Sequence, residues 1–268
     1  MNGPLPFLRL HNFRDLGGCP GDGGRAVRTG RLFRSDSLAK LGGADWERFL
    51  ALGIGTVIDL RYSWEIDAKG RVPEHPSFTY HHLSVEHRPY DQPSLGPSVA
   101  AGPYLAERYL EVAHDGVAEL SRAIEVIATA GDRPAVFHCT SGKDRTGLLA
   151  ALVLTLLGVS ESGIVEDFAR TGLASERLLA DWRAEHPGRG PVWPGYGRAP
   201  EEVMRLFLAA LTERYGSVRG YIDEQLDIDE TVIAALRKNL LEPHAGEGTV
   251  GGEERRQGQT SPSRGLLS

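Results

Sequence analysis

Two patterns of hydrophobic and polar positions alternate along this chain. Short runs of β-branched and other apolar residues at 31–34, 56–60, 80–85 and 135–138 have the length and composition of β-strands. Longer segments with apolar residues every three or four positions predict helices over 45–52, 104–129 with a break near residue 116, 146–157, 161–185, 201–215, 218–226 and 230–241. Because strands and helices alternate, we predict an α/β fold.

The same pattern sets the extent of the folded part. Residues 1–242 carry all the predicted elements and are expected to form one domain. Residues 243–268 are mainly Gly, Glu, Arg, Gln and Ser, with little apolar surface to bury, so we expect a disordered C-terminal tail. The proline-containing residues 92–103 and 187–200 are expected to form an exposed loop and a linker.

Composition argues against several classes of protein. The chain has 268 residues, of which 41% are hydrophobic and 25% charged, as is ordinary for a globular enzyme. A net charge of −6 and the lack of a long Lys/Arg run argue against a nucleic-acid partner. The longest apolar run, at 148–157, has about half the length of a membrane span, so we expect no stable membrane insertion.

Location is predicted from the N-terminus and from the cysteines. The first ten residues contain no apolar core of signal-peptide length. The two cysteines, Cys19 and Cys139, cannot form a disulfide framework in a chain of this size. We therefore expect a cytoplasmic protein, with export by a non-classical route left open. Cys19 is expected to be an ordinary surface or half-buried thiol.

One loop combines the residue types that bind and attack a phosphate. Cys139 follows the predicted strand at 135–138, five residues intervene, and Arg145 opens an apolar helix. A helix N-terminus binds anions and stabilises a thiolate, and Gly142 lets the backbone curl so that successive N–H groups point inward. The predicted phosphate-binding residues are Thr140, Ser141, Gly142, Lys143, Asp144 and Arg145.

Cys139 and Arg145 are predicted to be the catalytic pair. The planar guanidinium can contact two phosphate oxygens, and a thiolate beneath that phosphate is placed for in-line attack. His138 is expected to support the thiolate as a hydrogen-bond donor, and Thr146 is a further supporting candidate. The alternatives are a cysteine that only fills a strand end and a rhodanese-like sulphur transferase, whose loop is typically shorter. The lysine, arginine and following helix favour phosphate chemistry.

The segment at 138–147 resembles the signature His-Cys-x-x-Gly-Lys-x-Arg-Thr-Gly of the cysteine-dependent protein tyrosine and dual-specificity phosphatases. Asp144 in the variable position, and Asn-Phe-Arg-Asp-Leu-Gly-Gly at 12–18, make the chain similar to a bacterial branch with mycobacterial and Listeria members. The resemblance covers about residues 8–242. Further matching segments lie at 32–38, 59–65, 157–168 and 215–221.

The resemblance implies a sandwich fold with a mostly parallel central sheet flanked by helices. It also implies hydrolysis through a cysteinyl-phosphate at Cys139, without a metal or other cofactor. The substrate would be a phosphorylated protein or a phospholipid, with inorganic phosphate as a further ligand. Lys143 matches a lysine of lipid-active relatives, but it could equally be a second phosphate-facing cation without lipid preference. A small-phosphoester phosphatase and a catalytically silent phosphate-binding module are two competing hypotheses.

The proton donor to the leaving oxygen has three candidates. Many phosphatases of the superfamily use an aspartate on a separate mobile loop, which would fall between residues 83 and 93 here, where Glu86 and Asp91 are the available carboxyl groups. Asp144 lies inside the phosphate loop, and in myotubularin-like lipid phosphatases an aspartate at the matching position has this role. We favour Asp144, and the alternative is that it only braces the loop.

Two further pairs of charged residues accompany these motifs. Arg14 and Asp15 are expected either to orient the phosphate loop from behind or to fix a turn as a buried ion pair. Asp59 and Arg61 follow a predicted strand, so they would reach the ligand-binding edge of the sheet or pair with neighbouring acidic residues. The histidines at 81–87 lack metal-ligand spacing, and we predict no metal site there. The stretch at 86–102 is short and proline-containing, so we expect no two-helix lid from it.

Overall fold

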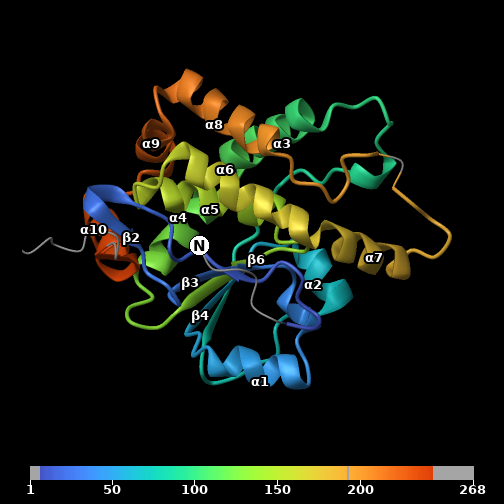
Figure 1. The fold of residues 1–268 in the computed structure, drawn as a ribbon, viewed down its shortest axis with the longest axis horizontal. Coiled ribbons are helices and arrows are strands. Elements are labelled where there is room, and N and C mark those ends of the chain that lie inside the picture. Colours follow the sequence, from blue (N-terminus) through green and yellow to red (C-terminus); the bar gives the residue numbers. More distant parts are fainter. Residues whose placement is uncertain (1–6, 192, 244–268) are drawn as a thin grey trace, which may run out of the picture.

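A mostly parallel five-stranded sheet forms the centre of the protein (Figure 1). The computed structural model describes residues 7–191 and 193–243. Across the sheet the strands are β1 (Arg14–Asp15), β3 (Leu32–Ser35), β6 (Ala135–His138), β4 (Thr56–Asp59) and β5 (Thr79–His82). Strand β1 pairs antiparallel to β3, and the remaining pairs are parallel. The predicted α/β class and mostly parallel sheet are confirmed, although β5 ends three residues before the predicted strand does.

The strands alternate their apolar side chains between two cores because successive side chains of a strand point to opposite faces. In β6, Val136 joins the smaller core while Phe137 joins the larger one. In β4, Val57 and Ile58 divide in the same way. Since both faces are covered, the strands consist largely of buried residues, as is typical of parallel sheets.

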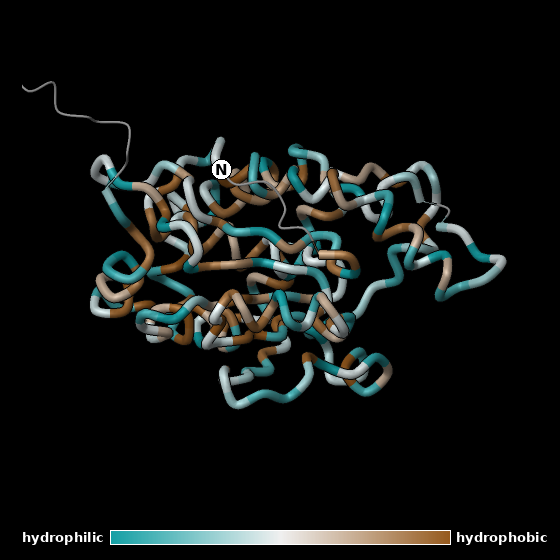
Figure 2. Tube along the Cα trace, turned by 60° about the horizontal axis from the view of Figure 1, so that its bottom comes forward, coloured by the Kyte–Doolittle hydropathy of each residue, from teal (hydrophilic) through white to brown (hydrophobic). Residues whose placement is uncertain are grey.

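Helices cover the two faces unequally. Figure 1 shows α1 on one side of the sheet and α4, α5, α6 and α8 on the other. Figure 2 shows the hydrophobic parts of the trace in its interior and many hydrophilic parts along the outer loops. The helices are α1 (Ala44–Ala51), α2 (Ser63–Lys69), α3 (Ala101–Asp115), α4 (Val117–Ala128), α5 (Asp144–Leu156), α6 (Glu161–Ala169), α7 (Ser175–Glu185), α8 (Glu201–Tyr215), α9 (Val218–Tyr221) and α10 (Glu230–Leu240).

The predicted helices are found except at two segments, and α2 lies where the sequence pattern predicted no helix. The predicted helix at 161–185 is two helices, α6 and α7, joined by the 3-10 turn η4 (Arg170–Ala174). The predicted helix at 218–226 continues from α9 into the π-helical turn η5 (Ile222–Leu226). At 86–102 the structure has only the 3-10 turn η3 (Gln92–Ser94) and the first residues of α3, so this stretch forms no two-helix lid.

Helix α7 is held to the rest of the protein mainly by polar contacts, because none of its residues is buried. Asp181 pairs with Lys40 at 2.7 Å and with His11 at 3.1 Å. At the other end, Glu185 pairs with Lys69 of α2 at 2.5 Å. Helix α7 therefore bridges the segment before β1 and the helix after β4.

A second, two-stranded sheet joins the two ends of the described chain. Strand β2 (Arg25–Val27) pairs antiparallel with β7 (Leu241–Pro243), and the Arg28 amide extends the pairing to the Leu240 carbonyl at 2.7 Å. The sequence pattern did not predict this sheet. The predicted C-terminal tail lies outside the described residues except for Pro243, which ends β7.

The register of the large sheet brings three strand ends together. His138, the last residue of β6, lies opposite both Ser35 of β3 and Asp59 of β4. The segments that follow these three strands therefore leave the sheet at the same edge. In open α/β sheets this carboxyl edge is where ligands bind.

Candidate active site

The loop between β6 and α5 occupies the centre of that edge. Cys139 is its first residue and is 2% exposed, and α5 begins at Asp144. Gly142 has a φ of 66°, in the left-handed region that favours glycine. A strand, a tight loop and an apolar helix therefore follow one another as the sequence predicted. The cysteine precedes the N-terminus of α5, the end of a helix whose dipole favours negative charge.

Two buried side chains hold the loop from behind through its carbonyl groups. The side-chain amide of Asn12 donates to the Ser141 oxygen at 2.9 Å and to the Gly142 oxygen at 3.0 Å. Arg34 donates to the same Gly142 oxygen at 2.8 Å. Both side chains come from segments that resemble the phosphatase family, but the sequence alone assigned no role to either. Their position inside those matching segments was the sequence signal from which a role could have been predicted.

The direction of the carbonyl groups sets the direction of the loop amides. The Thr140 oxygen also faces outward, because it accepts from the Ser37 amide at 3.1 Å. In a trans peptide unit the N–H group points opposite to the carbonyl. The amides of residues 141–143 consequently point to the inner side of the loop, and no acceptor for them is found among the described residues. This arrangement is an anion-binding nest.

Arg145 lies beside the loop and is fixed by Glu65 of α2. Its Nη1 lies 2.5 Å from Glu65 Oε2 and its Nη2 lies 3.1 Å from Glu65 Oε1, so the ion pair is bidentate. Glu65 also accepts from the Thr140 hydroxyl and from the Tyr62 amide. Although burial alone would raise the pKa of Glu65, Arg145 and these donors lower it. Glu65 is thus an ionised anchor that orients the arginine.

The remaining edge of Arg145 faces a second carboxyl group. Glu86 Oε2 lies 3.4 Å from Arg145 Nε, and Glu86 is 7% exposed. Glu86 Oε1 has no hydrogen-bond partner within the described part of the chain. Burial raises the pKa of Glu86 to about 7. The structure therefore brings this candidate proton donor next to Arg145, the arginine predicted to be catalytic.

Asp144, the candidate favoured from the sequence, is engaged by two donors. Its Oδ1 accepts from the Tyr109 hydroxyl of α3 at 2.7 Å and lies 3.0 Å from Lys143 Nζ. Lys143 is itself only 2% exposed. These contacts fit the loop-bracing alternative for Asp144, and its role as proton donor stays a prediction.

Asp91, the third candidate, is exposed and accepts from the Ser94 hydroxyl at 2.5 Å in the turn η3. Among the described residues, the structure shows no contact between Asp91 and the phosphate loop. By contrast, Thr146 is fully buried directly after Arg145, and its hydroxyl has no partner in the described part of the chain. Thr146 therefore has a free donor next to the loop.

The N-terminal motif supports the loop indirectly. Arg14 and Arg34 both pair with Asp167 of α6, at 2.9 and 2.5 Å, and these three side chains are buried. Arg14 also donates to Asn12, which holds the loop. Burial would raise the pKa of Asp167, but the two arginines lower it to about 2. Arg14 therefore supports the loop from behind through Asn12 and not by direct contact.

Asp15 fixes a turn, as one part of the alternative interpretation predicted, whereas the buried ion pair of Arg14 is made with Asp167. The Asp15 carboxylate accepts from the Gly17 amide at 2.8 Å and from the Gly30 amide at 2.6 Å. These contacts tie β1 to the turn that precedes β3. The two halves of the motif therefore have different roles.

Asp59 and Arg61 form a buried pair under the site. Arg61 Nη2 lies 2.7 Å from Asp59 Oδ2, so Arg61 pairs with Asp59 and not with the acidic residues that follow it in the sequence. Arg61 also donates to the Ser37 hydroxyl at 3.2 Å. Neither Asp59 nor Arg61 is more than 1% exposed, so the pair connects the segments after β3 and β4 and is not open to a ligand.

His138 completes this buried group. One ring nitrogen lies 3.3 Å from the Cys139 carbonyl oxygen and the other lies 3.5 Å from Asp59 Oδ2. Burial lowers the pKa of His138, because the charged ring loses its hydration. These contacts orient the backbone at the cysteine. A hydrogen bond from His138 to the thiolate stays a prediction.

Cys19, by contrast, lies in the larger core. It is 2% exposed, so the expectation of a surface or half-buried thiol is wrong. The Gly-Gly turn before Cys19 is typical of an exposed loop, so the local sequence did not indicate this burial. Cys19 is buried in the larger core together with residues from distant helices. Burial raises the pKa of Cys19 to about 11.

Within the described residues there is no group of three or more His, Cys, Asp and Glu side chains that could hold a metal ion. In the same part of the chain, no helix combines the length and apolar character needed to cross a membrane.

Comparison with known proteins places this site in a family. The profile of the tyrosine phosphatase family matches residues 5–242. A protein named as a tyrosine-protein phosphatase from Cupriavidus necator is 33% identical over 88% of each chain. The triple specificity protein phosphatase PtpB of Mycobacterium tuberculosis is 31% identical over 86% of this chain and 96% of its own.

The solved structure of Pseudomonas aeruginosa TpbA aligns with 69% of this chain and 89% of its own, at 18% identity and a TM-score of 0.29. The family match spans the strands, the helices and the phosphate loop described above. This chain belongs to the tyrosine phosphatase family.

Proposed function

We propose that this protein hydrolyses phosphotyrosine through a cysteinyl-phosphate intermediate at Cys139. The observation that carries the proposal is the loop whose amides point inward between the cysteine and Arg145. A phosphate bound by these amides receives the thiolate from below in an in-line displacement. Arg145, oriented by Glu65, contacts the equatorial oxygens that carry charge in the transition state. Inorganic phosphate is the product and a competing ligand.

The substrate is proposed to be a phosphorylated protein. Besides phosphotyrosine, the enzyme is proposed to accept phosphoserine and phosphothreonine, which would make it a dual-specificity phosphatase. A relative that is named a triple specificity protein phosphatase supports this breadth. Phosphoinositides and small phosphoesters are the alternative substrates. Because Lys143 is buried and lies beside Asp144, it would have to move before it could contact the additional phosphates of a lipid headgroup. This burial favours phosphoprotein.

Two further parts of the proposal concern turnover and location. A phosphate-binding module without turnover would keep the nest but lose the nucleophile or its arginine, whereas Cys139 and Arg145 are both present and adjacent. We propose a cytoplasmic location, since a reducing compartment would preserve the nucleophilic thiol.

The test measures turnover of p-nitrophenyl phosphate, phosphotyrosine, phosphoserine and phosphothreonine peptides, and a soluble phosphoinositide. Cys139→Ser should abolish turnover of every substrate, because a serine hydroxyl does not ionise near neutral pH. Arg145→Lys should reduce kcat/KM by about 10²-fold or more, because an ammonium cannot replace the planar fork. Activity of Cys139→Ser above a few per cent would disprove the nucleophile. A preference for the phosphoinositide over every peptide would disprove the substrate class.

A further inference from the structure

Glu86 lies where a proton donor to the leaving group is needed. It follows β5 by four residues, on the loop that faces the N-terminal end of α5. Its Oε2 is 3.4 Å from Arg145 Nε, on the edge of the guanidinium that Glu65 leaves free. Its Oε1 is buried without a partner among the described residues. A buried carboxyl oxygen without a donor is costly as an anion but not as a protonated group.

The surrounding charges indicate which carboxyl group holds a proton. Arg145 is already neutralised by Glu65, which accepts hydrogen bonds from three groups. A second carboxylate on the same arginine has no such support. Burial raises the pKa of Glu86 to about 7 although the charge of Arg145 and the Tyr62 hydroxyl lower it, and the charges of Asp144 and Glu65 add to the rise. Glu65 is therefore the ionised anchor and Glu86 the protonated neighbour.

The two rival carboxyl groups are less suitable. Asp144 Oδ1 accepts from the Tyr109 hydroxyl and lies 3.0 Å from Lys143 Nζ, so this oxygen is already engaged. Asp91 is exposed and bonded within its own turn. Of the three candidates, only Glu86 combines burial, proximity to Arg145 and a free oxygen.

We propose that Glu86 is the general acid of this phosphatase. The step rests on the proposed function. When the Cys139 thiolate attacks, the S–P bond forms, the P–O bond to the leaving group breaks, and the leaving oxygen takes the Glu86 proton. In the second half, Glu86 carboxylate accepts a proton from the attacking water as the P–S bond breaks. Phosphate, thiolate and protonated Glu86 are restored, so no further reactant is required.

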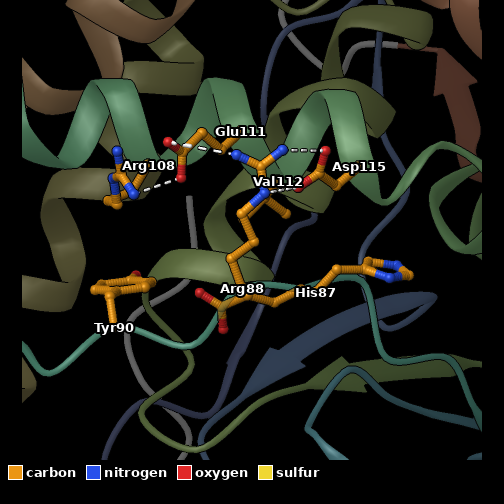
Figure 3. A pocket seen from close by; sticks show the side chains of 8 residues that line it. His87, Arg88, Tyr90, Arg108, Glu111, Val112 and Asp115 are labelled. Atoms are coloured by element: carbon orange, nitrogen blue, oxygen red, sulfur yellow. Dashed lines mark hydrogen bonds and ion pairs between the residues drawn. The ribbon is translucent and has the colours of Figure 1, made fainter.

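Four charged residues, Arg88, Arg108, Glu111 and Asp115, hold the loop that carries Glu86 against α3 (Figure 3), and we call them the clamp. Arg88 lies in a parallel two-bond arrangement with Asp115, with Nε–Oδ2 at 2.6 Å and Nη2–Oδ1 at 2.8 Å. Its Nη1 lies 3.9 Å from Glu111, which Arg108 holds at 2.5 Å. Glu86 lines a small cavity of about 10 Å³ together with Arg88, Glu111 and Asp115. Arg88 is thus a positioning residue for Glu86.

The first experiment compares leaving groups. Glu86→Gln should lower kcat for phenyl phosphate by about 10²–10⁴-fold and for p-nitrophenyl phosphate far less, since nitrophenolate leaves without a proton. The fall of kcat/KM above about pH 7 should disappear in this variant. Asp144→Asn and Asp91→Asn are measured in parallel. An equal loss on both substrates for Glu86→Gln, with a selective loss on phenyl phosphate for Asp144→Asn, would assign the proton to Asp144.

The controls separate this proposal from the proposed function. Cys139→Ser tests the nucleophile, and its outcome does not depend on the leaving group. Glu230→Gln, whose side chain is 81% exposed at the start of α10 and pairs with Arg219, should leave both substrates unchanged. If Cys139→Ser is inactive while Glu86→Gln shows no selective loss on phenyl phosphate, the proposed phosphatase function is supported and the assignment of Glu86 as general acid is wrong.

The second experiment tests the clamp. Arg88→Ala should slow phenyl phosphate by about tenfold to 10²-fold more than p-nitrophenyl phosphate, because misplacement of a catalytic group weakens only the step that needs it. Arg122→Ala is the matched control, since both arginine side chains are 60% exposed and Arg122 pairs with Glu125 away from the site. Arg88→Lys should recover part of the loss. Equal slowing of both substrates by Arg88→Ala would show that Arg88 has only a structural role.

Discussion

Glu65 and Glu86 contact one guanidinium but differ in every other contact. Glu65 receives donors from α2 and from the phosphate loop, whereas one oxygen of Glu86 receives none from the described residues. The same residue type therefore serves as an anchor in one position and as a proton carrier in the other. Environment, and not residue identity, sets the difference.

This difference predicts how stability depends on pH. The pKa of Glu86 is raised from 4.5 to about 7 by burial, so between these values the folded state keeps a proton that the unfolded state releases. The wild type should lose stability as pH rises through this window, by up to about 3 kcal/mol, while Glu86→Gln should not. Urea unfolding of both proteins at about pH 5 and about pH 8 measures this difference.

Glu107→Gln is the control for this measurement, and its pH dependence should match that of the wild type because the side chain is exposed. If the stabilities of the wild type and Glu86→Gln stay parallel over the whole range, Glu86 is ionised in the folded protein, and the proton-donor proposal loses its basis.

The two cysteines should differ in reactivity although each is 2% exposed. Cys139 lies at the N-terminus of α5 beside Arg145, where a thiolate is stabilised, whereas burial raises the pKa of Cys19 to about 11. Iodoacetate should therefore alkylate Cys139 first, and inorganic phosphate should protect it by filling the nest. Mass spectrometry of the two peptides measures both effects. Equal labelling, or no protection by phosphate, would contradict the electrostatics of the site.

At the scale of elements, the phosphate loop depends on the segments that pack behind it. Gly142 has a left-handed φ, and a Cβ there would overlap the Ser35 carbonyl at the end of β3. Asn12 and Arg34 bind the carbonyl groups on either side of the same residue. The shape of the loop is thus specified by β1, β3 and their flanks as much as by its own sequence.

Gly142→Ala should consequently destabilise the fold by about 1–3 kcal/mol or more and abolish phosphate protection of Cys139. Gly30→Ala is the matched control: its φ of 73° is also left-handed, but nothing lies within 4 Å of the added Cβ. Thermal unfolding of the two variants separates the two effects. Gly30→Ala measures the backbone strain alone, and the additional loss of Tm in Gly142→Ala measures the overlap of the new Cβ with Ser35. A similar loss of Tm in both would mean that the loop has room to move away from β3.

Local sequence pattern predicted most of these elements, since period and length are properties of a short segment. It placed α5 and β6, and with them the loop, nearly to the residue. It joined α6 and α7 into one helix, because the polar turn at Arg170–Ala174 keeps a helical spacing while its backbone tightens. It missed the β2–β7 sheet, whose two strands have three residues each and come from distant parts of the chain.

At the scale of the whole molecule, the site is assembled from segments that lie far apart in the sequence, three of which the sheet register brings to one edge. The sequence identified Cys139 and Arg145 because motif residues lie close together in the chain. It could not show that Glu65 anchors the arginine or that Glu86 is buried beside it, since these contacts span 80 and 59 positions. Asn12 and Asp167 lie in segments that match the family, but the sequence assigned them no role for the same reason. Long-range packing, which no local pattern records, decides which of several carboxyl groups matter.

The polar attachment of α7 gives the molecule a part that responds to ionic strength. Its ion pairs at Asp181 and Glu185 lie near the surface, where added salt weakens the attraction between opposite charges. The apolar core under α5 does not weaken in this way. Rising salt therefore loosens the attachment of one helix while the sheet and the nest stay intact. His11 and Lys40, the partners of Asp181, lie close to Asn12, which binds the phosphate loop. A change in ionic strength at the surface therefore acts close to the phosphate loop.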